Sequence, residues 1–404
     1  MKFANRMNRM GDKTLLSTME LTDAEDVISF GGGFPSPETY PLKEIKESFY
    51  RVLEEDAGGA LSYSSTRGYP KLRRLIAERM RKNYGLDYCE DEIIITNGSQ
   101  QALDLSGLLL IDKDDVVLFE TPSYLGALNA LKAYEARLCE VPTDDDGIQI
   151  DALVETLEKY GERVKLIYVI PDFQNPTGRC WSQERRKAFM EVVGRYDVAV
   201  LEDAAYSELS FHEELEKPLL SYDEKGQVVY CGTFSKVFCP GLRIGWVCAK
   251  RNLIEPFLLL KNNVDLSSAA ITQRQMADYL THNDLDQHIR RIVTLYKKRR
   301  DVMKAALRKE MPEGVTFHEP QGGLFFWLTL PEGRDSEILL ARALAEKVAF
   351  VPGGAFYPHK ARNNEMRVNF SNVSEAEIEE GIARLGRVIR TYLSEPVKTT
   401  EEFR

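Results

Sequence analysis

The sequence predicts an α/β protein with a largely parallel sheet in a large domain, followed by a smaller α+β domain. Two observations predict the large domain. Helical and strand patterns alternate up to Lys250, and the strands are short apolar runs of the kind buried on both faces of a sheet. The second domain is predicted because the pattern after Lys250 changes to long helical stretches and then to mixed strands and helices.

The elements of the large domain follow in order along the chain. Pro70 suits the first turn of an amphipathic helix, and Gly85 suits its carboxyl-terminal cap. Apolar runs then predict buried strands at 92–96, 116–120, 165–170, 198–203, 227–233 and 243–249. Polar residues follow several of these strands at their carboxyl ends, where open α/β folds bind ligands.

A charged helical stretch from Leu285 to Glu310 is expected to link the two domains. Beyond it, the pattern predicts a strand, a helix, a short strand, another strand and a closing helix, at 323–330, 336–347, 349–352, 366–370 and 374–392. We therefore expect an amino-terminal arm that contributes to the small domain, a large domain and a small domain, at residues 1–45, 46–285 and 286–404.

Composition narrows the classes of function. The formal net charge of −10 disfavours general affinity for nucleic acid or anionic membranes. The sequence has no leader-like segment and no run of ~20 uncharged apolar residues, so we expect a cytoplasmic protein with no membrane or nucleic-acid partner. Six cysteines without a CxxC pair and five histidines without HxH or HExxH spacing predict no metal.

The segment TFSKVFCPGLRIGW (233–246) is the most informative motif. It places Thr233, Ser235, Lys236 and Arg243 just after a predicted strand. Hydroxyls and a guanidinium can bind a phosphate dianion, and a lysine beside them can attack an aldehyde. These are the requirements of pyridoxal phosphate. A lone Ser-Lys pair is usually a surface feature, but this longer pattern is more specific.

The segment TNGSQQAL (96–103) predicts a second part of the same anion site. It reads as a strand end, a glycine turn and the first turn of a helix, with Ser99 and Gln100 as side-chain donors. Free backbone N–H groups and the positive end of a helix dipole attract anions there. An ordinary helix cap is the alternative interpretation of this segment.

The motifs QNPTG and LEDAAY each follow a buried strand. Asp203 suits a protonated pyridine nitrogen better than Glu202 does, and such a buried pair is expected to lower its pKa. Asn175 and Tyr206 can donate to a phenolic oxygen, and Tyr124 can stack on the ring. The alternative is that Asp203 caps a helix and that both tyrosines only pack.

Eight ordered motifs carry a resemblance to a known family: GGGFPSP (31–37), YSSTRGYPKLR (63–73), NGSQQAL, TPSY, NPTG, EDAAY, SKVFCPGLRIG and MRVNFS (366–371). In this order and spacing they resemble fold-type I pyridoxal-phosphate aminotransferases of class I/II, over nearly the whole chain. GGGxPxP and GSQQ make the chain most similar to the 2-aminoadipate and kynurenine aminotransferase branch. The resemblance implies a mostly parallel sheet of the seven-stranded type and a smaller α+β domain.

The resemblance also implies a role for each matching residue. Lys236, Asp203 and Tyr206 form the catalytic set, with Lys236 attached to the cofactor. The implied cofactor-binding residues are Ser99, Gln100, Tyr124, Asn175, Asp203, Tyr206, Thr233, Ser235, Lys236, Arg243 and Tyr63. Arg367 binds the substrate carboxylate with help from Asn175, and the backbone at Gly33 borders the substrate. Tyr63 reaches the phosphate of a neighbouring subunit, so a homodimer with shared active sites is implied.

The amino-terminal arm departs from this branch. Its aminoadipate and kynurenine enzymes carry an arginine there that helps to recognise the side chain, whereas no arginine occurs here between Gly11 and Tyr50. Arg6 and Lys13 are the nearby cations, but neither has the expected distance from GGGFP. Apolar residues of the arm and turn instead favour donors with aromatic or aliphatic side chains; they are Leu15, Leu16, Met19 and Phe34. The alternative is that these residues only pack the arm on the large domain.

The function predicted is transamination between a broad range of L-amino acids and a 2-oxo acid such as 2-oxoglutarate. Three alternatives stay open: a 2-aminoadipate or kynurenine specificity, a C–S lyase or decarboxylase reaction on the same scaffold, and the effector domain of a transcription regulator. The last is the least supported, because GGGFP begins at Gly31 and a winged helix is expected to need more chain before it.

Overall fold

The computed structural model describes residues 1–4, 6–7, 26–359 and 363–396. Within these ranges the larger sheet has eight strands in the order β2-β9-β8-β7-β6-β3-β4-β5. Strands β8, β7, β6, β3 and β4 run parallel, while β9 is antiparallel to both of its neighbours and β5 to β4. The α/β class with a mostly parallel sheet is therefore confirmed; β5, with two residues, adds to the seven longer strands.

The bounds of these strands agree with most of the sequence expectations. They are β2 (Ile93–Thr96), β3 (Val116–Thr121), β4 (Arg137–Asp144), β5 (Gly147–Ile148), β6 (Val164–Val169), β7 (Ala199–Asp203), β8 (Val228–Thr233) and β9 (Gly245–Cys248). The sequence did not predict β4, because charged and exposed residues interrupt it and leave no continuous apolar run.

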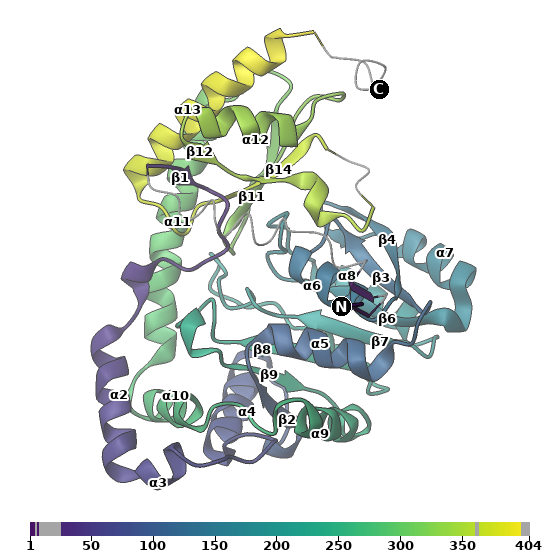
Figure 1. Cartoon of the computed structure of the whole chain (residues 1–404), viewed down its shortest axis with the longest axis vertical. Helices are drawn as coiled ribbons and strands as arrows, with labels where there is room; N and C mark the ends of the chain where they lie inside the picture. The colour runs from purple at the N-terminus through teal and green to yellow at the C-terminus, as the bar shows by residue number, and fades with distance from the viewer. Residues whose placement is uncertain (5, 8–25, 360–362, 397–404) are drawn as a thin grey trace.

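Helices cover the sheet in groups (Figure 1). One group packs α5 (Ser99–Leu110) against α6 (Leu125–Lys132) and α9 (Arg251–Asp265), and another packs α7 (Ile150–Tyr160) against α8 (Gln183–Val193). Along the lower edge of Figure 1 lie α2 (Leu42–Glu55), α3 (Ala57–Ala60), α4 (Pro70–Tyr84) and α10 (Ala270–His282). Helix α4 begins at Pro70 and is capped by Gly85 at a φ of 71°, as predicted.

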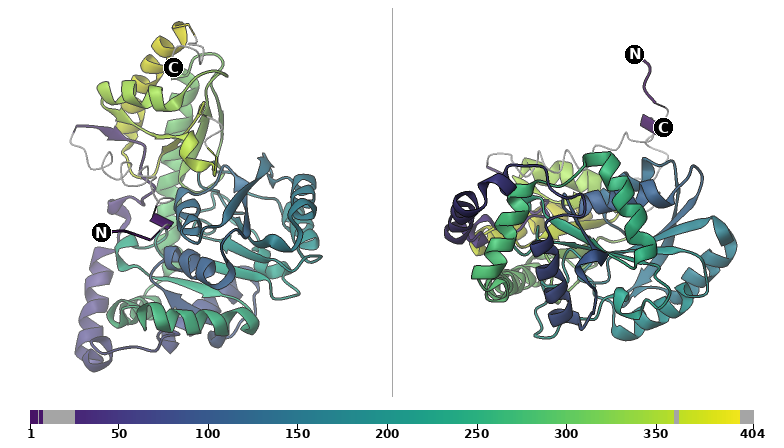
Figure 2. Two further views of the ribbon diagram at one scale, coloured as in Figure 1. Left: turned by 45° about the vertical axis from the view of Figure 1, so that its right-hand side comes forward. Right: turned by 90° about the horizontal axis from the view of Figure 1, so that it is seen from below.

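A second sheet lies beyond the long helix α11 (Leu285–Glu310), which rises from the lower edge of the molecule and packs against α13 (Glu375–Ser394) (Figures 1 and 2). Among the described residues this sheet has the antiparallel order β10-β11-β14-β13. Its strands are β10 (Thr316–His318), β11 (Phe325–Thr329), β13 (Val351–Pro352) and β14 (Glu365–Asn369). Helix α12 (Ser336–Ala345) lies beside α13.

The amino-terminal segment joins this second unit. Strand β1 (Ile28–Ser29) pairs in parallel with β12 (Val348–Ala349). The glycine run at 31–33 follows β1. It lies beside Arg367 of β14 and near the residues that follow the parallel strands. The exact domain boundaries stay a prediction. In the described ranges, we find no helix whose length and hydropathy suffice to span a lipid bilayer.

Candidate active site

A cavity of about 310 Å³ lies where the loops after the parallel strands face β14 and the glycine run. All the predicted site residues except Tyr63 line this cavity. They are Gly33, Ser99, Gln100, Tyr124, Asn175, Asp203, Tyr206, Thr233, Ser235, Lys236, Arg243 and Arg367. A second depression of about 460 Å³, between α8 and the turn Leu219–Tyr222, holds none of them. We place the site in the first cavity because the chemistry-bearing groups converge there.

Lys236 follows β8 and is the amine in the cavity wall. Its Nζ donates a hydrogen bond to the carbonyl oxygen of Gly33 at 2.7 Å. Burial lowers the pKa of Lys236 and the charges of Arg367 and Arg243 add to the effect; with the opposing effect of Asp203, the pKa is about 8. A lysine with this pKa has a substantial neutral fraction near neutral pH, which is the nucleophilic form.

Asp203 ends β7 and is 4% exposed. Its Oδ2 accepts a hydrogen bond from the Tyr168 hydroxyl at 2.8 Å, whereas Oδ1 is buried without a hydrogen-bond partner among the described residues. Burial raises the pKa of Asp203 to about 6, and the Tyr168 bond and the Lys236 charge only partly oppose it. The sequence expectation of a lowered pKa concerns Asp203 paired with a protonated ring nitrogen and stays a prediction; in the protein alone desolvation is the largest effect.

Removing the Asp203 carboxyl is expected to stabilise the cofactor-free protein at neutral pH. The folded pKa of about 6 exceeds the unfolded value of 3.8, so this carboxyl costs stability as pH rises between those values. Asp203→Asn is expected to be more stable than wild type by about 2–3 kcal/mol at pH 8, with the difference vanishing near pH 4. Urea unfolding at pH 8 and pH 4 measures the difference in free energy of unfolding between the variant and wild type. Asp151→Asn, at an exposed position of α7, is the control. Equal differences at the two pH values would contradict it.

Asn175, Tyr206 and Tyr124 surround the middle of the cavity. Asn175 Nδ2 donates to the Tyr206 hydroxyl at 3.2 Å. Tyr206 meets Phe325 edge-on, with ring centroids 5.8 Å apart. Burial raises the pKa of Tyr124 to about 12, and it raises the pKa of Tyr206 as well. Both phenols therefore stay neutral donors at physiological pH and suit a phenolate oxygen or a ring face.

The two predicted anion-binding segments meet around Arg243. Helix α5 begins at Ser99, and Gly98 before it has a φ of 73°. A Cβ at Gly98 would lie 2.4 Å from Arg243 Nη2, and one at Gly245 would lie 2.8 Å from the main-chain nitrogen of Ser99. Glycine at both positions thus lets the guanidinium approach the helix start closely, and the pair makes a positively charged recess for a phosphate.

The hydroxyl residues of this recess form a short turn after β8. Thr233 Oγ1 donates to the carbonyl of Ile244 and accepts from the main-chain N–H of Ser235 at 3.1 Å in both cases. Both side chains are buried and line the cavity beside Gln100, whose Nε2 donates to the Gly126 carbonyl at 3.3 Å. Thr233, Ser235 and Gln100 thus place hydroxyls and an amide in the cavity wall, and such groups can bind an oxyanion.

Arg367 on β14 enters the cavity from the second sheet. Its Nη1 donates to Asn175 Oδ1 at 2.8 Å and its Nη2 to the Gly31 carbonyl at 2.6 Å, while its buried Nε has no partner among the described residues. The guanidinium lies 4.3 Å from the centroid of the Phe325 ring. Burial lowers the pKa of Arg367 to about 10, so it remains a cation and suits a carboxylate.

Some predicted residues lie elsewhere. Tyr63 is 90% exposed and is not part of the cavity wall. Arg6 is exposed and does not line the cavity either, whereas Phe34 does. Lys13 and the apolar arm residues Leu15, Leu16 and Met19 lie outside the described residues.

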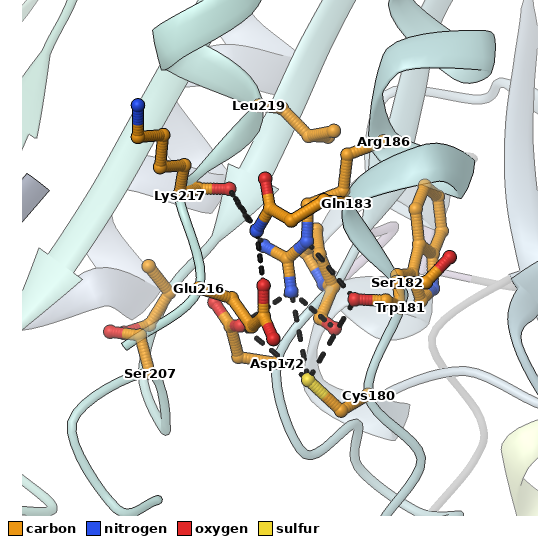
Figure 3. Close-up of polar contacts among 12 residues, drawn as sticks. Asp172, Cys180, Trp181, Ser182, Gln183, Arg186, Ser207, Glu216, Lys217 and Leu219 are labelled. Carbon is orange, nitrogen blue, oxygen red and sulfur yellow. Dashed lines mark hydrogen bonds and ion pairs between the residues drawn. The ribbon is translucent and has the colours of Figure 1, made fainter. Parts of the chain in front are cut away.

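The structure adds Arg186, which sequence reasoning missed. This fully buried side chain on α8 donates to Asp172 Oδ1 at 2.6 Å and to the carbonyls of Pro171 and Trp181 at 3.2 Å (Figure 3). It therefore ties together both ends of the loop that carries Asn175 into the cavity. An arginine among the polar residues of an amphipathic helix gave no signal of this burial.

The described residues fit pyridoxal phosphate on three observations. Asp203 Oδ1 is a buried acceptor that lacks a donor, as a protonated ring nitrogen would supply. The glycines at the start of α5 leave a cationic recess that suits a phosphate. Lys236 supplies an amine in the wall of the same cavity. The described part of the chain has no group of three His, Cys, Asp or Glu residues arranged to hold a metal ion.

Comparison with known proteins decides the family. The family model Aminotransferase class I and II matches residues 25–385. This chain belongs to the class I and II aminotransferases. The aminotransferase is 43% identical to the aromatic-amino-acid aminotransferase 1 of Thermococcus litoralis over 391 residues, which cover 96% of this chain and 94% of that relative.

Other relatives come from the predicted branch. The aminotransferase is 36% identical to the 2-aminoadipate transaminase of Thermus thermophilus over 395 residues, 97% of each chain. The crystal structure of Pyrococcus horikoshii kynurenine aminotransferase, in complex with PMP, matches with a TM-score of 0.93 at 39% identity, over 97% of this chain and 98% of that one. An uncharacterised HTH-type transcriptional regulator of Bacillus subtilis is 30% identical, over 91% of this chain and 75% of its own.

These findings confirm the resemblance, the fold type, the enzyme class and the cofactor predicted from the sequence. The aminotransferase depends on pyridoxal phosphate. The regulator alternative is not favoured, because the enzymes match at higher identity and over nearly their full length.

Proposed function

We propose that this aminotransferase moves the amino group between L-amino acids with aromatic or aliphatic side chains and a 2-oxo acid such as 2-oxoglutarate. The observation that carries the proposal is the set of cations in the cavity. Lys236, Arg243 and Arg367 are the cationic residues in the described part of its wall. We assign them to the amine, the phosphate and the α-carboxylate. Among the described residues of the wall, no further cation is available for a distal carboxylate.

When bound, pyridoxal phosphate receives the amino group and spreads the charge left at the substrate Cα into its ring. Lys236 would hold the cofactor through Nζ, and the same amine would serve as the base for the proton at the substrate Cα. Asp203 is proposed to hold the ring nitrogen protonated through Oδ1. Asn175 and Tyr206 hold the ring oxygen, and Tyr124 packs on the ring face.

The remaining residues bind and orient. Ser99, Gln100, Thr233, Ser235 and Arg243 are proposed to hold the phosphate. Arg367 is proposed to hold the substrate α-carboxylate with Asn175, in place of its present bond to the Gly31 carbonyl. Gly33 then borders the substrate, since a Cβ there would lie 3.4 Å from the Phe325 ring and 4.0 Å from Arg367 Nη1.

A panel of amino donors with 2-oxoglutarate tests the substrate class. Leucine, methionine, phenylalanine and tyrosine are expected to be better donors than 2-aminoadipate, because a buried unpaired carboxylate is costly. Broad use is expected, since each methylene in an apolar pocket contributes only about 1–3 kcal/mol. The measurement is kcat/KM for each donor. A tenfold or greater preference for 2-aminoadipate over leucine and phenylalanine would contradict the proposal and direct attention to Arg6 and Lys13.

The same assay separates the other reactions on this scaffold. Transamination yields a 2-oxo acid and glutamate without ammonia, whereas β-elimination releases ammonia and decarboxylation releases carbon dioxide.

A Phe34→Ala variant tests the side-chain pocket, because Phe34 lines the cavity and has no role in amine or phosphate binding in the proposed scheme. It is expected to change the order of donors more than the retention of cofactor.

We also propose a homodimer with shared active sites. Large apolar side chains are exposed on α2 and α9 and in the segments that follow α3 and α9; they include Leu42, Tyr50, Leu61, Tyr63, Leu259 and Leu266. A second copy of this chain is the partner we propose for these side chains, because it would cover Tyr63, an aromatic residue that is 90% exposed in the single chain.

A cytoplasmic location also stays a proposal. The six free thiols fit a reducing compartment.

Mixed dimers test the shared site. Tyr63→Phe is expected to weaken cofactor retention modestly, because one hydrogen bond to phosphate is lost. A dimer that joins a Tyr63→Phe subunit to a Lys236→Ala subunit has one site with an intact lysine. If Tyr63 crosses the interface, that site keeps its Tyr63 from the Lys236→Ala subunit and retains cofactor like wild type. Retention at the Tyr63→Phe level would contradict the crossing.

A further inference from the structure

Tyr168 is a buried side chain that the scheme above does not use. It lies in the middle of the apolar run of β6 and is 0% exposed. Its ring packs against Phe119, with ring centroids 5.4 Å apart. Its hydroxyl donates to Asp203 Oδ2 at 2.8 Å. A buried tyrosine hydroxyl ordinarily has a hydrogen-bond partner, and here that partner is the carboxylate that faces the cavity.

Strand register brings the two side chains together. Strands β6 and β7 are parallel, with Tyr168 opposite Leu201. Side chains alternate along a strand, so Tyr168, Leu201 and Asp203 share one face. Glu202 points to the other face, where its carboxylate accepts from the main-chain N–H groups of Leu219 and Leu220 at 2.7 and 3.0 Å. Tyr168 thus reaches forward along β7 to the carboxylate at its end.

The contact makes the two carboxylate oxygens of Asp203 unequal. Oδ2 is held by the phenol, and Oδ1 is the oxygen that lacks a partner among the described residues. The main-chain N–H of Ala205 also interacts with this carboxyl, but the phenol is the stronger of the two hydrogen bonds. Without the phenol, the terminal torsion of Asp203, which is broad for Asp, would lose its main restraint. With it, one oxygen is fixed and the other is presented to the cavity.

We propose that Tyr168 is a positioning residue for transamination: by donating to Oδ2 it holds Asp203 so that Oδ1 meets the ring nitrogen of the cofactor, and it keeps the carboxylate ionised. The inference rests on the proposed role of Asp203. It assigns to a residue outside the cavity wall a control over the charge of the cofactor ring.

The electrostatics agree with this geometry. Burial raises the pKa of Asp203 to about 6, and the Tyr168 hydrogen bond is the largest effect that lowers it. The titratable groups around this carboxyl are Lys236 after β8, Cys231 on β8, and the phenols of Tyr124, Tyr168 and Tyr206. Burial raises the pKa of each of these phenols and of the Cys231 thiol, so they stay neutral while Asp203 titrates.

The test compares two changes at position 168 that act in opposite directions. Tyr168→Phe removes the donor, and replacement by 3,5-difluorotyrosine strengthens it with little change in shape. In the cofactor-free protein, infrared spectroscopy follows protonation of the Asp203 carboxyl, assigned with Asp203→Asn. Phenylalanine at position 168 is expected to raise the titration midpoint of the Asp203 carboxyl by about one to two pH units, because a hydrogen bond to a charged group contributes a free energy of this size. The fluorinated residue is expected to lower it.

The loaded enzyme supplies the second readout. Tyr168→Phe is expected to lower kcat about tenfold or more, with KM for the amino donor changed less than twofold, since substrate binding at Arg367 is untouched. Tyr392→Phe is the matched control, because it removes another buried tyrosine hydroxyl. Tyr392 lies on α13, its hydroxyl accepts from the Asp335 N–H at 3.0 Å, and it does not line the cavity. This variant is expected to match wild type in both readouts.

Two results would overturn the proposal. One is an Asp203 titration that is the same with tyrosine, phenylalanine and difluorotyrosine at position 168. The other is a shifted titration with an unchanged kcat. If Tyr168→Phe does not fold, the protein with difluorotyrosine tests the proposal alone: a lowered titration midpoint of Asp203 supports it, and an unchanged or raised midpoint contradicts it. The infrared readout needs no turnover, so an inactive wild type would count against the proposed function and not against the Tyr168 contact.

Discussion

Lys236→Ala is expected to abolish essentially all turnover and all cofactor that borohydride can attach covalently to the protein. Lys236 is the amine in the cavity, with Nζ held 2.7 Å from the Gly33 carbonyl and a pKa lowered to about 8. Alanine removes both the attachment point and the proposed base, and no compensating amine lines the described part of the cavity wall. Reduction with borohydride followed by mass spectrometry of peptides measures the attachment, and a donor assay measures turnover.

Lys250→Ala is the control for this experiment. Lys250 is an exposed lysine after β9, and its loss is expected to leave both readouts at the wild-type level. Cofactor that remains covalently trapped in Lys236→Ala would identify another lysine as the attachment point and would contradict the alignment of the SKVFCPGLRIG motif. The phosphate recess is unchanged in Lys236→Ala, so noncovalent binding of the cofactor is expected to persist.

Arg367→Leu is expected to lower kcat/KM for amino donors by about 2–5 kcal/mol, roughly 30-fold to several thousand-fold. The reason is the loss of a two-pronged pair with the substrate carboxylate in a desolvated site. Cofactor affinity is expected to change far less, because the recess around Arg243 lies on the other sheet. Arg367→Lys keeps the charge without the planar fork and should recover only part of the loss.

The readouts for Arg367 are kcat/KM for several donors and the Kd of the cofactor. Arg384→Leu is the control, because Arg384 lies on α13 and pairs with Glu380 on the surface. An unchanged KM for several amino acids in Arg367→Leu would reject the role. A thermal melt accompanies the assay, since the substitution also leaves Asn175 Oδ1 and the Gly31 carbonyl without their present donor.

The sequence predicted the part of the site that depends on local pattern. Lys236, Asp203 and Asn175 each follow a continuous apolar run, and such runs indicate buried strands whose carboxyl ends share one edge. Arg367 is different, because long-range pairing of β11 with β14 brings it there, and only the family resemblance indicated it. Tyr168 gave no signal, since a tyrosine within an apolar run reads as core.

The alternation of Glu202 and Asp203 has a consequence for how this protein tolerates insertions and deletions. Both carboxyls are buried, and they differ only in which side of β7 they occupy. A slip of one residue in the pairing of β7 would exchange them and would turn Asp203 toward Leu219 and Glu202 toward the cavity. Length changes in the exposed loops leave each carboxyl on its present face of β7, whereas one residue gained or lost within β7 exchanges the two faces. The pairing register of β7 thus decides which of the two carboxyls faces the cavity.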